Sequence, residues 1–215
     1  PDELRDMIEL GQSVFNRLAT IGIPSVAVIH GACVGGGYEV CLACDYRIAS
    51  PDKVTKIGLP ETQLGIIPAW GGSTRLPRLI GLPKALDVIL GGKTLAAKPA
   101  LKCGMIDDIV PREYLVEKAC QLILKRAAKL RVRPTRLTHS IAKMDVVMNF
   151  IAKKVQKQVL QKTRGHYPAI PKALEVVTRG LKKSLDASLA LERDAILELG
   201  GTEACRNLIR IFFLQ

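Results

Sequence analysis

The sequence predicts an α/β fold, because strand-like and helix-like patterns alternate along it. A short β-branched run leads through a glycine turn into an apolar helix and a second short strand. Beyond Pro83 the apolar residues recur almost wholly at helical spacing. Of the 215 residues, 48% are hydrophobic and 24% are charged, which allows a packed core and excludes disordered and fibrous classes. No apolar run approaches the ~20 residues of a membrane span, so we expect no transmembrane segment.

The first segment predicts an amphipathic helix that ends at Gly22, before Pro24. Gly11 lies on the apolar face of this helix. The other residues of that face are Leu4, Met7, Ile8, Phe15 and Leu18.

The next elements form the β-α-β pattern on which the fold class depends. Residues 25–30 are apolar and β-branched, which predicts a buried strand. Three glycines at 35–37 predict a turn into a helix over 38–44, and residues 46–49 predict the second strand. A strand, a crossover helix and a strand favour parallel pairing.

The remaining chain divides into a loop-rich and a helical part. Residues 51–83 are rich in glycine and proline, so we expect loops there. We expect helices near 141–155 and 185–199, and one from 204 to 214, with Ser184 and Thr202 as N-caps. We place the domain boundary near residue 111, with an α/β core over 1–110 and a helical region over 111–215.

The net charge of +12 is unevenly distributed. Residues 125–183 contain 16 Lys and Arg but only two acidic residues, Asp145 and Glu175. A solvated helix face explains such a segment, and so does a surface for polyanions such as nucleic acid, acidic lipid or a nucleotide cofactor. The nucleic-acid hypothesis depends on charge alone, and the 4% aromatic content argues against a base-stacking platform. We therefore expect no nucleic-acid partner.

The strongest candidate site joins the three glycines Gly35, Gly36 and Gly37 to two carboxyl groups, Glu39 and Glu61. Glycines at a helix start expose unpaired N–H groups that suit an oxygen gaining negative charge. Glu39 lies in an otherwise apolar helix, where a carboxyl group has a raised pKa. Together the two carboxyl groups form a candidate acid–base pair. The alternative is a plain tight turn beside two surface charges.

Other motifs give little support for a metal or a redox cofactor. Cys41 and Cys44 form a lone C-x-x-C in an apolar helix, which indicates buried thiols rather than zinc. The sequence contains no G-x-G-x-x-G, P-loop, H-E-x-x-H or G-x-S-x-G pattern. Six cysteines without a regular framework indicate reduced thiols, so we expect a cytoplasmic protein.

Several spaced motifs closely resemble the enoyl-CoA hydratase/isomerase (crotonase) superfamily. Residues 24–39 read PSVAVIHGACVGGGYE, and residues 57–68 read IGLPETQLGIIP. Further agreement follows at 71–76 and between 91 and 111, so the resemblance covers about the first 125 residues. The tail motifs KTRGHYPA at 162–169 and EACRNLIRIFF at 203–213 are similar to the α subunits of fatty-acid oxidation complexes.

The resemblance implies a crotonase-like spiral of ββα units with an α-helical C-terminal tail. It implies hydration of 2-enoyl-CoA thioesters in fatty-acid β-oxidation, with isomerase chemistry at the same carboxyl groups. Gly36 would supply one of two backbone N–H groups to the thioester oxygen, Glu39 would be the base, and Glu61 would protonate the α carbon. Acyl-coenzyme A is then a substrate, and no cofactor or metal is expected.

Some family features have no counterpart in this sequence. The N-terminal strand and loop that carry the second N–H donor are missing, and Ala69 and Trp70 stand where small residues are usual. We expect a truncated domain with impaired catalysis, and the alternative function is a structural or assembly role in a multienzyme complex. Expected partners are enoyl-CoA substrates and either further copies of the chain or dehydrogenase and thiolase components.

Overall fold

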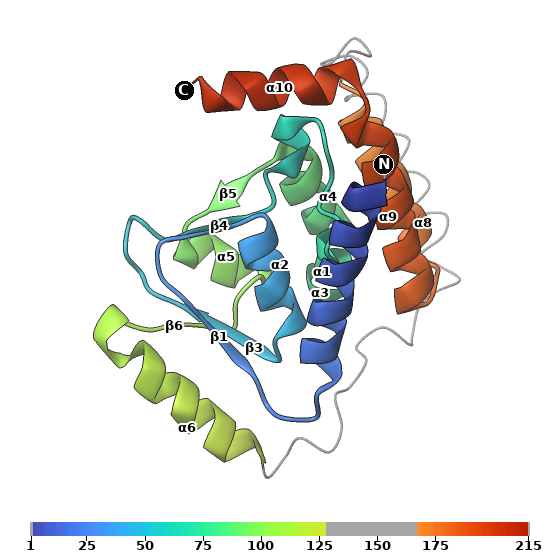
Figure 1. Cartoon of the computed structure of the whole chain (residues 1–215). Helices are drawn as coiled ribbons and strands as arrows, with labels where there is room; N and C mark the ends of the chain where they lie inside the picture. Colours follow the sequence, from blue (N-terminus) through green and yellow to red (C-terminus); the bar gives the residue numbers. More distant parts are fainter. Residues whose placement is uncertain (1, 128–166, 215) are drawn as a thin grey trace.

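The computed structural model describes residues 2–127 and 167–214, which fold into two small sheets surrounded by helices (Figure 1). The strands are β1 (Val26–Ile29), β2 (Ala32–Val34), β3 (Tyr46–Ala49), β4 (Lys56–Gly58), β5 (Thr94–Leu95) and β6 (Asp108–Ile109). The α-helices are α1 (Asp2–Thr20), α2 (Gly36–Ala43), α3 (Gly72–Ile80), α4 (Leu82–Gly91), α5 (Ala97–Cys103), α6 (Leu115–Ala127), α8 (Ala169–Gly180), α9 (Leu185–Gly200) and α10 (Glu203–Phe213). Two 3₁₀ turns complete the described elements, η1 (Glu61–Leu64) and η2 (Arg112–Tyr114).

The chain passes back and forth between the two sheets. One sheet has the order β1-β3-β6 and the other β2-β4-β5. Strands β1 and β3 are parallel with Val26 opposite Tyr46, and β2 and β4 are parallel with Ala32 opposite Lys56. Strands β1 and β3 of the first sheet are each followed by a strand of the second sheet and then by a helical segment, as expected for ββα units, whereas β6 is followed directly by η2 and α6. The predicted parallel pairing across the crossover helix is confirmed.

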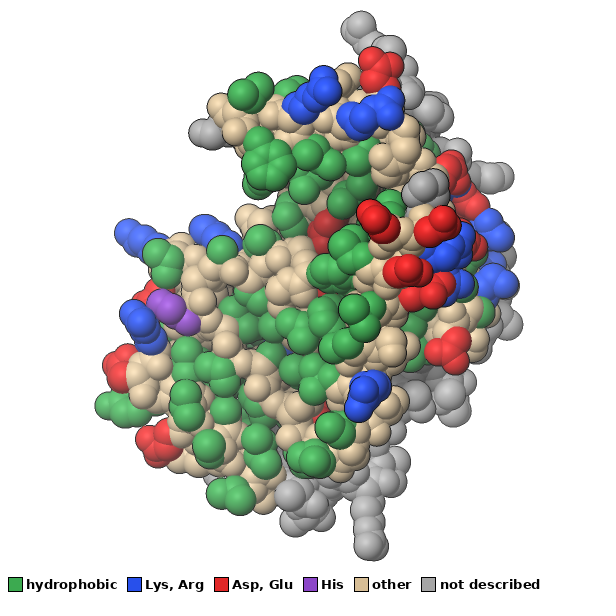
Figure 2. Space-filling view, in the orientation of Figure 1, with side chains coloured by type: hydrophobic (Ala, Val, Ile, Leu, Met, Phe, Trp, Pro, Cys, Tyr) green, Lys and Arg blue, Asp and Glu red, His purple; other side chains and the backbone are tan. Residues whose placement is uncertain are grey.

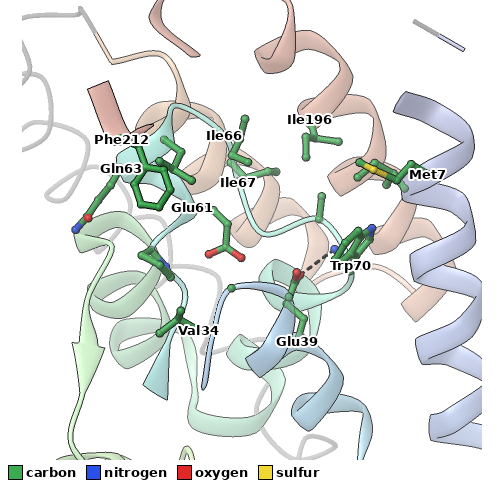
Figure 3. Close-up of a pocket in the computed structure, with 16 residues that line it drawn as sticks. Met7, Val34, Glu39, Glu61, Gln63, Ile66, Ile67, Trp70, Ile196 and Phe212 are labelled. Carbon is green, nitrogen blue, oxygen red and sulfur yellow. Dashed lines mark hydrogen bonds between the residues drawn. The ribbon is translucent and has the colours of Figure 1, made fainter. Parts of the chain in front are cut away.

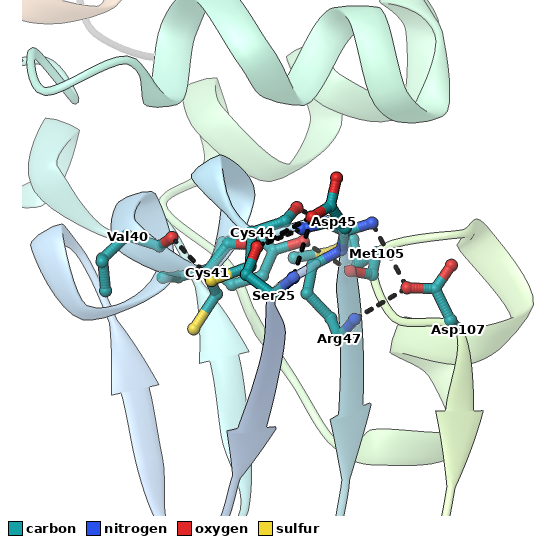
Figure 4. A network of polar contacts seen from close by, with 9 residues as sticks. Ser25, Val40, Cys41, Cys44, Asp45, Arg47, Met105 and Asp107 are labelled. Carbon is teal, nitrogen blue, oxygen red and sulfur yellow. Dashed lines mark hydrogen bonds and ion pairs between the residues drawn. The ribbon is translucent and has the colours of Figure 1, made fainter. Parts of the chain in front are cut away.

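Helix α2 is anchored at its C-terminal end by a buried arginine of β3 (Figure 4). The Arg47 guanidinium donates to the carbonyl oxygens of Cys41 (3.3 Å) and Cys44 (2.9 Å) and pairs with Asp107 (3.2 Å). A cation at this end of a helix satisfies its unpaired carbonyls and opposes its dipole. The hydroxyl of Tyr38, which is fully buried, donates to the carbonyl of Met105 (2.8 Å). These bonds fix the helix that carries the candidate site.

The expectation of loops over residues 51–83 is wrong for more than half of that segment. It contains β4, η1, all of α3 and the start of α4. Helix α3 forms although it begins beside two glycines and contains Pro77, because six consecutive residues, 72–77, are buried against neighbouring helices. Tertiary burial therefore overrides the low helix propensity of these residues. Strand β2 was also not predicted, since it has only three residues between two glycines.

The C-terminal helices share the core of the sheets. Buried residues of α8 and α9, including Val177 and Leu199, belong to the same hydrophobic cluster as Ile29 and Ile57 of the strands. The predicted N-caps are confirmed, since Ser184 Oγ accepts from the Ala187 N–H (3.3 Å). Thr202 Oγ1 likewise accepts from the Cys205 N–H (3.2 Å).

The predicted first helix is confirmed with one correction to its face. Ile8 is buried, but Met7 is 49% exposed and lies at the edge of the face. Gln12 takes the buried position instead, because its amide donates to the carbonyls of Ala69 (2.8 Å) and Leu189 (2.9 Å).

Two predicted features lie outside the described residues. They are the helix near 141–155 and, apart from its ends, the basic segment 125–183. Among the residues that the structure does describe, none of the helices is both long enough and apolar enough to cross a membrane.

Candidate active site

A pocket of about 420 Å³ lies between the start of α2, the 3₁₀ turn η1 and the helices α1, α9 and α10 (Figure 3). Figure 2 shows the surface hollowed beneath α10, with hydrophobic side chains on both sides of the hollow. Four of the five predicted site residues line the pocket: Gly35, Gly36, Glu39 and Glu61. Its walls are otherwise mainly apolar, formed by Met7, Ile8, Val34, Pro60, Leu64, Ile66, Ile67, Ala69, Trp70, Ile196 and Phe212.

The glycine turn brings backbone close to this pocket. Gly35 has a φ of +57°, a conformation that favours glycine, and its N–H donates to the Gly58 carbonyl (3.0 Å). A Cβ at Gly35 would lie 3.3 Å from Glu61 Oε1, so the turn directly faces that carboxyl group. Gly36 begins α2, and within the described residues its N–H has no backbone partner. An unpaired N–H at the positive end of a helix suits a developing negative charge. Gly37, the fifth predicted residue, lies one position further along α2.

Glu39 is held at the pocket by two backbone donors. Its Oε1 accepts from the N–H groups of Trp70 (2.8 Å) and Gly72 (2.8 Å), and its side chain is only 3% exposed. Burial raises the pKa of Glu39 to about 7, while the two N–H bonds and the nearby Arg75 act in the opposite direction. This carboxyl group therefore exchanges protons near neutral pH.

Glu61 points into the same pocket without such support. It is 9% exposed, and neither carboxyl oxygen has a hydrogen-bond partner among the described residues. Burial, followed by the negative charge of Glu39, raises the pKa of Glu61 to about 8. The two carboxyl groups are thus close enough for the charge of one to change the pKa of the other. Glu61 stays protonated to a higher pH than Glu39.

Trp70 forms the wall behind the glycine turn. A Cβ at Gly36 would lie 2.7 Å from its ring, and one at Gly11 of α1 would lie 2.3 Å from its Nε1. Phe15 packs edge-on against the ring, with centroids 5.9 Å apart. The indole therefore fits only because both contacting helices carry glycine at these positions.

A third buried glutamate adjoins the site, and the sequence analysis did not identify it. Glu192 of α9 is fully buried, and its Oε2 accepts from the Gly71 N–H (2.8 Å). Its spacing could have indicated it, because a glutamate at position 192 falls on the same helix face as the apolar residues Leu189 and Ile196. The role of the loop before α3 in holding Glu39 was also missed, because a backbone donor leaves no signature in residue type.

The six cysteines range from buried to exposed: Cys33, Cys41 and Cys205 are buried, and Cys120 is exposed. All six are free thiols, with Cys41 buried and Cys44 partly buried. Within residues 2–127 and 167–214, there is no group of three or more potential ligands that could hold a metal ion.

The chain is similar to known proteins over almost all of its length. Residues 5–172 match the profile of the family described as enoyl-CoA hydratase/isomerase. The chain is 44% identical over 213 residues to the "Fatty acid oxidation complex subunit alpha" of Vibrio cholerae, covering 98% of this chain and 30% of that protein. The chain thus spans less than a third of the length of such relatives.

Two solved structures show the same fold. The enoyl-CoA hydratase of Bacillus anthracis superimposes with a TM-score of 0.54 at 26% identity, covering 94% of this chain and 64% of that one. An enoyl-CoA hydratase/isomerase from Pseudoalteromonas atlantica gives a TM-score of 0.61 at 20% identity, covering 93% and 65%. The predicted crotonase-like architecture with helical C-terminal segments is confirmed.

Proposed function

Because this chain belongs to the enoyl-CoA hydratase/isomerase family, we propose that it carries the site that adds water to 2-enoyl-CoA thioesters in fatty-acid oxidation. One observation carries the proposal: two buried carboxyl groups, Glu39 and Glu61, share an apolar pocket with the unpaired N–H of Gly36. The apolar walls suit an acyl chain, and the polar groups converge at one side of it.

The unequal surroundings of the carboxyl groups support separate roles. Glu39, stabilised as a carboxylate by two N–H bonds, takes a proton from the water that attacks the β carbon. Glu61, with the higher pKa, gives its proton to the α carbon. The Gly36 N–H stabilises the thioester oxygen as negative charge develops there.

The same groups support isomerisation. A carboxylate at either position would remove a proton from one carbon of the acyl chain and return it to another. Both reactions conserve the oxidation level of the substrate, so we propose that the site needs no redox cofactor. We also propose that the two carboxyl groups and the Gly36 N–H supply the proton transfer and charge stabilisation without a metal.

Substitution of each carboxyl group in the full-length protein tests this function. We expect Glu39→Gln and Glu61→Gln each to reduce crotonyl-CoA hydration by about 100-fold or more, because each removes one proton-transfer step. Loss of absorbance at the enoyl-thioester band measures the rate, and Glu113→Gln at an exposed position is the control. Unchanged turnover in both variants would refute the assignment.

An assembly role is the second candidate, supported by the exposed apolar end of α10. Ile211, Phe212 and Phe213 are 52%, 56% and 80% exposed, as a surface that binds another protein would be. We propose a multienzyme complex or a homo-oligomer as its setting, and the free thiols favour the cytoplasm. Normal complex formation by a wild-type protein without hydratase activity would favour this candidate.

A further inference from the structure

The loop before α3 connects two buried carboxyl groups through three consecutive N–H groups. Trp70 and Gly72 donate to Glu39 Oε1, each at 2.8 Å. Between them, Gly71 donates in a different direction, to Glu192 Oε2 at 2.8 Å. The loop that holds Glu39 is therefore itself held from α9.

The conformation of this loop depends on Gly71. Its φ is +112°, and a Cβ there would lie 1.7 Å from Nη1 of Arg75. The same Nη1 donates to the Trp70 carbonyl (3.3 Å), and Arg75 Nη2 bonds to Asn16 of α1. Arg75 thus supports one side of the loop, while Glu192 binds the N–H that points away from Glu39.

We propose that Glu192 is a positioning residue for Glu39, because it binds the Gly71 N–H and so keeps the neighbouring Trp70 and Gly72 N–H groups directed at the Glu39 carboxyl. The role given to Glu39 in catalysis rests on the proposed function, whereas the link between the two glutamates rests on the contacts alone. Without an acceptor at position 192, the buried Gly71 N–H would be unpaired, and the loop would turn to satisfy it.

Burial and the negative charge of Glu39 favour the neutral form of Glu192, and two arginines oppose them. Glu39 on α2 faces it with like charge, and Arg75 and Arg78 on α3 face it with opposite charge. Burial and the Glu39 charge together raise the pKa of Glu192 to about 8. Glutamine, which copies the shape of a protonated glutamate, should therefore replace it well.

Two variants of the full-length protein separate these contributions. Glu192→Leu removes the acceptor at similar volume, and we expect kcat to fall about tenfold with KM changed less than about twofold. The weakened N–H bonds should also raise the pKa of Glu39, moving the acidic limb of the pH–rate profile to higher pH by on the order of one unit. Glu192→Gln should restore both quantities. Glu198→Gln, at an exposed position of the same helix, is the matched control.

Infrared titration of the Glu39 carboxyl, assigned by its loss in Glu39→Gln, gives a readout that does not depend on activity. A raised midpoint in Glu192→Leu and a normal one in Glu192→Gln would support the proposal. If Glu192→Leu does not fold, Glu192→Asp takes its place, because its shorter side chain withdraws the acceptor by one methylene. We then expect a smaller fall in kcat and a smaller rise in the pKa of Glu39. The proposal is overturned if Glu192→Leu, or Glu192→Asp in its place, keeps the wild-type kcat and the wild-type pKa of Glu39. It is also overturned if Glu192→Gln loses as much activity as Glu192→Leu. Absence of hydratase activity in the wild type would refute the proposed function only.

Discussion

Glu39 and Glu61 share one pocket but differ in what surrounds their carboxyl groups. Glu39 extends from α2 and accepts two backbone N–H bonds, whereas both oxygens of Glu61 in η1 are without a partner among the described residues. Burial raises the pKa of both, to about 7 and about 8 respectively. The two N–H donors and Arg75 favour the charged form of Glu39, whereas the negative charge of Glu39 favours the protonated form of Glu61.

This contrast supports a different proposed role for each glutamate, although the residue type is the same. A base needs a carboxylate that is fixed in place, and an acid needs a proton that it can release. In the proposed mechanism the backbone of one loop separates these roles, so changes to that loop should affect Glu39 far more than Glu61.

The largest effect is expected from Gly72→Ala, which acts on the Glu39 side alone. The added Cβ would lie 2.9 Å from Glu39 Oε1 and 2.7 Å from Pro68. Because Glu39 would have to move, we expect kcat for enoyl-CoA hydration to fall about 100-fold. Steady-state kinetics would measure this, with circular dichroism to show that the fold is kept. A variant with wild-type kcat would mean that the loop does not position the base.

A smaller effect is expected on stability from Gly36→Ala. Its Cβ would meet the Trp70 ring, which cannot retreat because Gly11 contacts the opposite side. Overpacking of this kind should lower the free energy of unfolding by about 1–3 kcal/mol. Urea unfolding of the full-length protein would measure it.

Gly37→Ala provides the matched control for that experiment. A Cβ at Gly37 has nothing within 4 Å, and alanine is the better helix former by about 1 kcal/mol. The control should therefore be neutral or stabilising. Equal destabilisation of both variants would show that the turn, rather than contact with Trp70, requires glycine.

The smallest effect is the dependence of the wild-type rate on pH. Deprotonation of Glu39 near pH 7 should raise kcat/KM, and deprotonation of Glu61 near pH 8 should lower it, since one must be charged and the other protonated. We expect a bell-shaped profile of kcat/KM against pH, with an optimum between these two pKa values. Within one pH unit of the optimum on either side, kcat/KM should fall by no more than about tenfold. A rate that still rises above pH 9 would contradict the assignment of Glu61 as the acid.

The α/β body was predictable because its signals are local. The parallel pair β1 and β3, the helix between them and the caps Ser184 and Thr202 follow from residues next to one another in sequence. The segment 51–83 was misjudged because α3 gains its stability from burial against distant helices, which outweighs its glycines and Pro77. Short strands such as β2 depend equally on partners that are remote in sequence.

The glycine turn and the two carboxyl side chains of the candidate site were predictable, but the loop that holds Glu39 was not. The glycine turn, Glu39 and Glu61 stand in recognisable motifs, and the structure places Gly35, Gly36 and both carboxyl groups around one pocket. The donors that lower the pKa of Glu39 are the backbone N–H groups of Trp70 and Gly72, and almost any residue type could supply such a group. Glu192 lies 153 positions beyond Glu39 in the chain, so only the folded chain shows that one loop joins them.

The pocket wall draws on residues that lie far apart in the sequence, with Met7 and Ile8 from α1 and Ile196 and Phe212 from α9 and α10. During synthesis the ribosome releases the glutamates and the glycine turn long before it releases those last two residues. The nascent chain therefore passes through a stage that carries Glu39, Glu61 and the Gly36 N–H but lacks two residues of the pocket wall. A chain that stopped before α9 would hold both carboxyl groups beside an incomplete, open pocket.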